Sequence, residues 1–239
     1  KIRNKIDKFA EQVTAFRTDF LANCPFGTDN AIAQDYDASY EILNTYHRKT
    51  AEISDHAKEF NNLELLFDMV QSNYRALKDS KDDLVLLKNL WDTTVLVQDT
   101  FLDWNSVLWD KIDTDELLLR VKDLATQVKV MPKGCRGWKL YNWLTEQVKN
   151  MSTVLPLINE LHSDTMRDRH WTMLMTTTGK SFEKNAEFCF KDLLDLKLHQ
   201  FADDVSEIVD QSTKEAKIEK KLTTIRTTWS AMTVTFDCS

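Results

Sequence analysis

Thr178-Gly179-Lys180-Ser181 is the segment that comes closest to a catalytic motif, because Gly-Lys-Ser closes the phosphate-binding loop of many nucleotide hydrolases. Such a loop needs a second glycine five residues before Gly179, and Leu174 occupies that position. A strand should also precede the loop, whereas the residues before Gly179 follow a helical pattern. We therefore interpret Gly179 as the residue that ends a helix, and we predict no catalytic residue and no bound nucleotide or other cofactor in this chain.

The histidines and cysteines are spaced too widely to predict a metal site. His162 and His170 are eight residues apart, whereas two helical ligands of one metal ion are typically four apart. His162 is better explained as a polar residue at a packed helix end. The cysteines show no paired spacing, which favours reduced thiols in a cytosolic compartment over a disulfide framework; they are Cys24, Cys135, Cys189 and Cys238.

Arg167, Arg169 and His170 form a basic cluster in an otherwise acidic chain. One interpretation is a solvated helix face whose charges pair locally with Asp164 and Asp168. The other is a contact that forms in one state of a mechanical element and breaks in another. The sequence leaves both open.

Tryptophan is unusually frequent, with seven residues. We predict core positions for Trp91 and Trp229, because a buried indole anchors helix packing. For Trp109 both a core position and an interface position stay open. If one helix carries Trp104 and Trp109, their spacing of five residues prevents both side chains from lying on the same narrow apolar stripe. The candidate structural or interaction residues are Trp91, Trp109, Arg169, His170, Trp171 and Trp229.

Glycine and proline are scarce: the 239 residues include 4 Gly and 3 Pro, against roughly 17 and 12 at average usage. Few turn-forming residues favour long helices, and no segment shows the period-two alternation of a strand. The net charge of −7 disfavours nucleic acid or an anionic membrane as a partner. No run of 18 apolar residues predicts a membrane span.

Apolar residues recur at helical spacing along the chain, and the first such stripe runs from Ile2 to Phe20. Pro25 and Gly27 end this helix, and the next one, which extends to Phe60, should pack against it in antiparallel orientation. Further helices are predicted over 63–77, from 79 or 80 to 108, 113–128, 138–150, 152–161, 164–178, 190–198 and 199–236. The fold class is all-α: an elongated array of long antiparallel helices forming helical bundles.

The last predicted helix carries an apolar stripe through Leu222, Ile225, Trp229 and Met232. We expect these side chains to fix the helix to its neighbours. Under that expectation, Trp229→Ala costs about 3–5 kcal/mol by truncation of a core residue.

Several motifs, in order, resemble dynein heavy chains, and axonemal members in particular. Arg169-His170-Trp171 follows the apolar block Leu155-Pro-Leu-Ile-Asn-Glu-Leu161, as in the linker region of that family. The other matching segments are Leu108-Trp-Asp-Lys-Ile112, Val148-Lys-Asn-Met151, Phe190-Lys-Asp-Leu-Leu-Asp-Leu196 and Ala216-Lys-Ile-Glu-Lys-Lys-Leu222 with Ile225 and Trp229. The resemblance covers the chain from about residue 84 to its end.

The resemblance implies a mechanical role. In that family the linker is a helical rod across a ring of ATPase modules, and its swing is the power stroke. Residues 1–80 would be a helical bundle of the neck or tail end, and residues 81–239 the N-terminal part of the linker, with a joint near 131–137. We expect a non-catalytic fragment of a longer chain, whose parent binds ATP and Mg²⁺ in its ring.

The implied partners are the AAA+ ring of the same heavy chain, and other dynein heavy, intermediate or light chains. A microtubule would be reached only through the parent chain. The implied location is the cytoplasm and cytoskeleton, in the axoneme of a cilium or flagellum. The alternative function is a static helical scaffold or tethering bundle with no motor.

Overall fold

The structure is a computed structural model that describes residues 2–184 and 187–232. Within these residues the regular secondary structure is helical, and the one exception is an isolated bridge between Leu108 and Cys189, so the predicted all-α class is confirmed. The elements are α1 (Ile2–Asn23), α2 (Asp29–Ala33), α3 (Tyr36–Leu66), α4 (Arg75–Asn105), η1 (Trp109–Lys111), α5 (Thr114–Lys129), η2 (Lys133–Cys135), α6 (Lys139–Leu161), α7 (Asp168–Thr178), α8 (Phe190–Leu194), η3 (Leu198–Gln200) and α9 (Ala202–Ala231).

The chain divides into two compact units, and α4, α5 and α6 each contribute to both. The first unit comprises residues 1–100 and 124–148, and the second comprises residues 101–123 and 149–239. The domain boundary near residue 80 and the joint near 131–137 stay predictions. The helix break at the latter position is observed, because α5 ends at Lys129 and α6 begins at Lys139.

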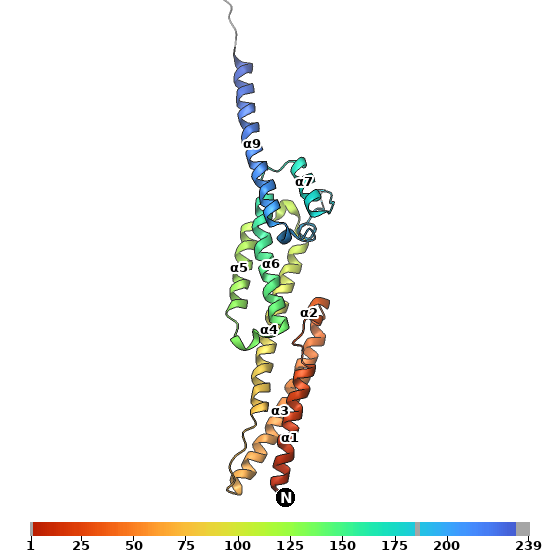
Figure 1. The fold of residues 1–239 in the computed structure, drawn as a ribbon, viewed down its shortest axis with the longest axis vertical. Helices are drawn as coiled ribbons and strands as arrows, with labels where there is room; N and C mark the ends of the chain where they lie inside the picture. The colour runs from red at the N-terminus through yellow and green to blue at the C-terminus, as the bar shows by residue number, and fades with distance from the viewer. Residues whose placement is uncertain (1, 185–186, 233–239) are drawn as a thin grey trace, which may run out of the picture. The chain divides into compact units, whose positions relative to one another are not determined.

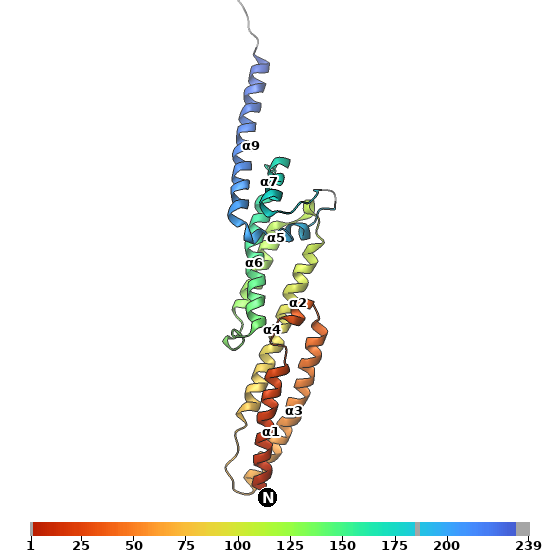
Figure 2. The ribbon, with the colours of Figure 1, turned by 45° about the vertical axis from the view of Figure 1, so that its right-hand side comes forward.

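In the first unit, α1 and α3 pack along their apolar stripes. Figures 1 and 2 both show them side by side and running in opposite directions, as predicted. The stripe of α1 is buried at Ile6, Phe9, Val13, Phe16 and Phe20. The rings of Phe9 and Phe60 stack at 4.7 Å, and Phe20 meets Tyr46 edge-on at 5.5 Å. Burial of each such side chain contributes about 1.5–3 kcal/mol.

Trp91 of α4 lies in the centre of the first unit. Its side chain is fully buried, and its indole Nε1–H donates to the carbonyl of Pro25 at 2.9 Å. The next residue, Phe26, accepts a backbone hydrogen bond from Leu140 and packs edge-on against Trp138. The predicted core position of Trp91 is therefore correct.

The connection between α3 and α4 differs from the prediction of continuous helix over 63–77. Helix α3 ends at Leu66, and α4 begins at Arg75 rather than at 79 or 80. The buried carboxylate of Glu64 accepts from the backbone N–H of Ser72 at 2.7 Å and from its hydroxyl. This side chain turns the backbone away from the helix, which composition alone does not reveal.

Two further helix boundaries need correction. Residues 139–161 form one helix with Pro156 inside it, where the sequence predicted two. An internal proline costs about 3 kcal/mol, but Leu155, Ile158 and Leu161 are almost fully buried and offset that cost. Helix α7 begins at Asp168 rather than at Asp164.

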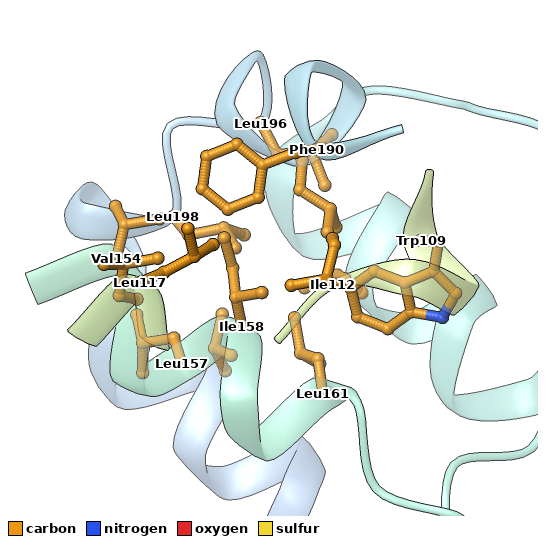
Figure 3. Packing of buried hydrophobic residues seen from close by; sticks show 14 of the residues in the cluster. Trp109, Ile112, Leu117, Val154, Leu157, Ile158, Leu161, Phe190, Leu196 and Leu198 are labelled. Atoms are coloured by element: carbon orange, nitrogen blue, oxygen red, sulfur yellow. The ribbon is translucent and has the colours of Figure 1, made fainter. Parts of the chain in front are cut away.

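The core of the second unit is built from short elements around the end of α6 (Figure 3). Trp104 and Trp109 are both buried in it, so of the two alternatives left open for Trp109 the core position is the one observed. Both can be buried because they do not share one helix: α4 ends at Asn105, and Trp109 lies in η1. The backbone N–H of Trp109 donates to Phe188 and that of Phe190 donates to Val107, both at 2.9 Å, which holds this turn in place.

Helix α9 is buried only near its beginning, at Val205, Ile208 and Ser212. Trp229 is 72% exposed, so its predicted core position is wrong. Leu222, Ile225 and Met232 are also exposed, so the expectation that they fix the helix to its neighbours is wrong for the described residues. Figures 1 and 2 show this half of α9 extending away from α7. Phe236, the last predicted stripe residue, and Cys238 lie outside the described residues.

We predict that Trp91→Ala lowers the free energy of unfolding by about 3–5 kcal/mol, because it leaves a cavity and removes the donor to Pro25. Trp229→Ala is the matched control, and should change the free energy of unfolding by no more than about 0.5 kcal/mol. Urea denaturation followed by circular dichroism measures both. A large loss for Trp229→Ala would show that its indole is covered in solution.

Candidate functional site: the contact between helices α7 and α9

His170 is the central residue of the contact between α7 and α9. Its side chain is fully buried, and Nδ1 accepts the backbone N–H of Arg167 at 3.1 Å. Because Nδ1 is an acceptor, the proton sits on Nε2, which donates to the carboxylate of Glu215 at 3.1 Å. One imidazole therefore caps the start of α7 and holds α9.

The arginines of the basic cluster point at the same helix. The guanidinium of Arg169 lies 2.5 Å from Glu215 and 2.9 Å from Glu219, and Arg167 lies 3.3 Å from Glu219. Glu215 and Glu219 are four residues apart, so they share one face of α9. Asp164 and Asp168, the expected local partners, form no ion pair with these arginines; only the backbone carbonyl of Asp164 accepts from Arg167.

The network shifts the acidity of its carboxylates. A hydrogen bond from Gln211, followed by one from Arg169, lowers the pKa of Glu215 below its usual 4.5. For Glu219 the hydrogen bond from Arg169 is the largest cause of the lowered pKa, followed by that from Arg167. Both carboxylates are therefore charged at neutral pH.

Hydroxyl groups and apolar side chains complete the contact. Thr165, in the turn before α7, shares a hydrogen bond of 3.0 Å with Ser212. The Ser212 side chain is fully buried and also donates to the carbonyl of Val209 at 2.7 Å. Below it, Val205 and Ile208 are buried in the core of the second unit. Helix α9 is thus held from Val205 to Glu219, over about its first five turns.

Trp171 and Trp109 belong to an aromatic cluster behind α7. Their rings meet edge-on at 5.7 Å, and Trp109 also packs on His162, whose Nε2 lies 3.1 Å from the carbonyl of Trp109. The Nζ of Lys184 lies 5.1 Å from the centre of the Trp171 ring. Trp171, Trp109 and His162 thus brace the helix that carries Arg169.

The Gly-Lys-Ser segment has the geometry of a helix end. Gly179 follows α7 with φ of 68° and ψ of 15°, the left-handed conformation in which glycine ends a helix. Lys180 donates to the carbonyl of Asp195. Among the described residues, no group of three or more histidine, cysteine or acidic side chains is placed to hold a metal ion. None of the helices in that part of the chain is both long and apolar enough to cross a bilayer.

Of the candidate residues, Arg169, His170 and Trp171 lie together with Trp109 in this region of the second unit. Trp91 lies in the core of the first unit, and Trp229 lies on the exposed half of α9. The sequence analysis missed Glu215 and Glu219. Their spacing of four residues was a usable signal for a face that pairs with arginines.

We predict that carbon NMR titration of the side-chain carboxyls gives pKa values below 4.5 for Glu215 and Glu219. Arg169→Ala should raise the pKa of Glu219 more than that of Glu215, because Gln211 still donates to Glu215. Since the pKa values are lowered in the folded state, their stabilising contribution is complete above pH 4.5 and is lost as the pH falls through the folded values. Unshifted titrations in the wild type would show that the network does not persist in solution.

Comparison with known proteins identifies the family. A family model for the dynein heavy chain, N-terminal region 2, matches residues 77–238. The chain is 38% identical over 245 residues to the dynein beta chain of the flagellar outer arm of Chlamydomonas reinhardtii, covering 99% of this chain and 5% of the relative. It is 34% identical over 231 residues to the ciliary dynein beta chain of Heliocidaris crassispina, with 97% and 5% covered.

A third relative is dynein axonemal heavy chain 11 of Sus scrofa, 30% identical over 236 residues, with 99% of this chain and 5% of the relative covered. The chain thus spans about 5% of the length of these relatives. The resemblance carried by Arg169-His170-Trp171 and the neighbouring motifs is confirmed. The chain belongs to the dynein heavy chain family, as part of its N-terminal region.

Proposed function

We propose that this chain is a force-transmitting element, the linker with its preceding neck helices, of an axonemal dynein heavy chain. The observation that supports this role is that α9 is attached to the second unit mainly through its N-terminal part. Its first turns are held by His170, by the Arg169 ion pairs and by core packing, while the large apolar side chains beyond Glu219 are exposed. A helix held at one end can pass a displacement of its free end to the unit that holds it.

The chemistry of the contact suits this role. Exposed ion pairs contribute little to stability individually, but several of them, joined to a buried imidazole, define one angle between α7 and α9. We propose further that this region hydrolyses no ATP and binds no nucleotide, and that both activities reside in the ring of the parent chain. The relatives are flagellar and ciliary chains, and we propose the axonemal cytoskeleton as the location of this one.

The proposed partners follow from the same role. They are the AAA+ ring of the same heavy chain and other dynein heavy, intermediate or light chains, with a microtubule reached only through the parent chain. Nucleic acid and membrane are not among them, because the net charge of the chain is −7.

The test replaces Arg169 by Ala in a complete heavy chain. We expect the rate of ATP hydrolysis to stay the same while microtubule gliding slows severalfold, because the displacement of the ring is no longer passed through α9. Hydrogen exchange at the amides of the first half of α9 should speed up in the same variant, since their anchoring is weakened.

The matched control is Arg120→Ala, which removes an exposed arginine from α5 in the same unit. It should leave gliding, hydrolysis and exchange unchanged. If gliding persists at full speed while exchange in α9 rises, the contact does not carry force. That outcome would favour a static scaffold.

A further inference from the structure

A groove runs between α3 and α4 in the first unit, and the role proposed for α9 does not involve it. It encloses about 700 Å³. Its walls are linked by two hydrogen bonds, one from Tyr40 to Asp92 at 2.7 Å and one from Lys81 to Ser54 at 2.5 Å. On α3 the lining extends from Tyr40 to Lys58, which is about 27 Å at about 1.5 Å per residue. The shape is a long channel, which suits a helix better than a compact ligand.

The floor of the groove is apolar with one unmatched polar atom. Leu43 and Leu84 are buried beneath it, while Ala51 and Val85 line it from exposed positions, Val85 at 70% exposure. Thr50 lines the same groove and is 4% exposed, yet its hydroxyl oxygen has no hydrogen-bond partner among the described residues. Buried hydroxyls are normally paired, so Thr50 is an unmatched polar group beneath the groove.

The charges around the groove are mainly positive. Lys58 pairs with Asp55 at 2.8 Å, and Lys88 pairs with Asp92 at 2.7 Å. Lys81 differs, because the partner of its ammonium is the neutral hydroxyl of Ser54, and it forms no ion pair with a carboxylate of the described residues. His47 also lines the groove. Lys81 also helps to lower the pKa of Asp55, after the hydrogen bond and charge of Lys58. The lining thus carries three lysines against one carboxylate, that of Asp55. This excess of positive charge beside an apolar floor favours a ligand that is both apolar and anionic.

We propose that this groove binds an amphipathic helix of a separate partner polypeptide, whose apolar seam covers Ala51 and Val85 and whose carboxylates meet Lys81. A second copy of this chain is a poor occupant, because a symmetric contact would bring together two linings that both carry an excess of lysines. The excess of lysines in the lining therefore favours a partner helix with acidic side chains beside its apolar seam.

The test uses the full 239-residue chain and two labelled helical peptides of about 18 residues, the length of the groove. Both peptides carry a leucine seam; one is flanked by glutamates and the other by lysines. We expect saturable binding of the glutamate peptide by fluorescence anisotropy, and binding at least about tenfold weaker for the lysine peptide. Binding of the glutamate peptide should weaken as salt is raised.

Lys81→Glu and Val85→Asp should each weaken binding of the glutamate peptide about tenfold. The matched controls lie outside the groove: Lys78→Glu on α4 and Leu119→Asp on α5, where Leu119 is 62% exposed. They should change binding by less than about twofold. Lys88→Glu, at a side chain that is 62% exposed, is the second variant if Lys81→Glu alters the helicity measured by circular dichroism.

Three results would overturn the proposal. They are no saturable binding of the glutamate peptide, equal binding of both peptides, and equal losses in groove and control variants. Sedimentation of the chain alone tests the other occupant, since a dimer that Val85→Asp dissociates would assign the groove to a second copy.

Discussion

The buried imidazole of His170 is the constraint on which the α7–α9 contact depends. It accepts the Arg167 N–H at the start of α7 and donates to Glu215 on α9, so each ring nitrogen serves a different helix. A lysine or arginine could not replace it, because neither has an acceptor for the backbone N–H. Asparagine has both functions but a shorter reach. The start of one helix and the position of another are thus defined by one side chain.

The second constraint is that an apolar helical stripe is stabilising only where something covers it. In α1 the stripe is covered by α3, and the rings of Phe9 and Phe60 are in contact. In α9 the same periodicity continues through Leu222 and Trp229, but within the described residues nothing covers it. As far as Glu219, α9 therefore draws stability from tertiary contacts, and beyond that residue its stability depends mainly on helix propensity.

This difference explains how much the sequence could predict. Periodicity correctly predicted the helices, the α1–α3 pairing and the core position of Trp91, because these follow from local spacing and from a partner adjacent in the chain. Gly179 as a helix end and Asp113 as a cap were also predictable; the Asp113 carboxylate accepts from the Glu116 N–H at 3.1 Å. Each of these depends on a few neighbouring residues.

The errors at Trp229, at Arg169 and at the start of α7 involve contacts between residues distant in sequence. Nothing local shows that Trp229 is uncovered. Nor does anything local show that Arg169 pairs with Glu215, 46 residues away, rather than with Asp164 or Asp168. The start of α7 was misplaced for the same reason, since Thr165 is held in its turn by Ser212 of α9. In the groove between α3 and α4, nothing local shows that Lys81 donates to Ser54, 27 residues away.

The exposure of Trp229 has an optical consequence. The other tryptophans are buried or half-buried, and Trp229 alone is exposed, at 72%. A collisional quencher dissolved in the buffer therefore reaches its indole first, and the red-edge emission of the chain comes mainly from the far end of α9. A protein that binds this end of α9 and covers Trp229 would shift this emission to shorter wavelength. The fluorescence of Trp229 therefore reports binding at this end of the helix.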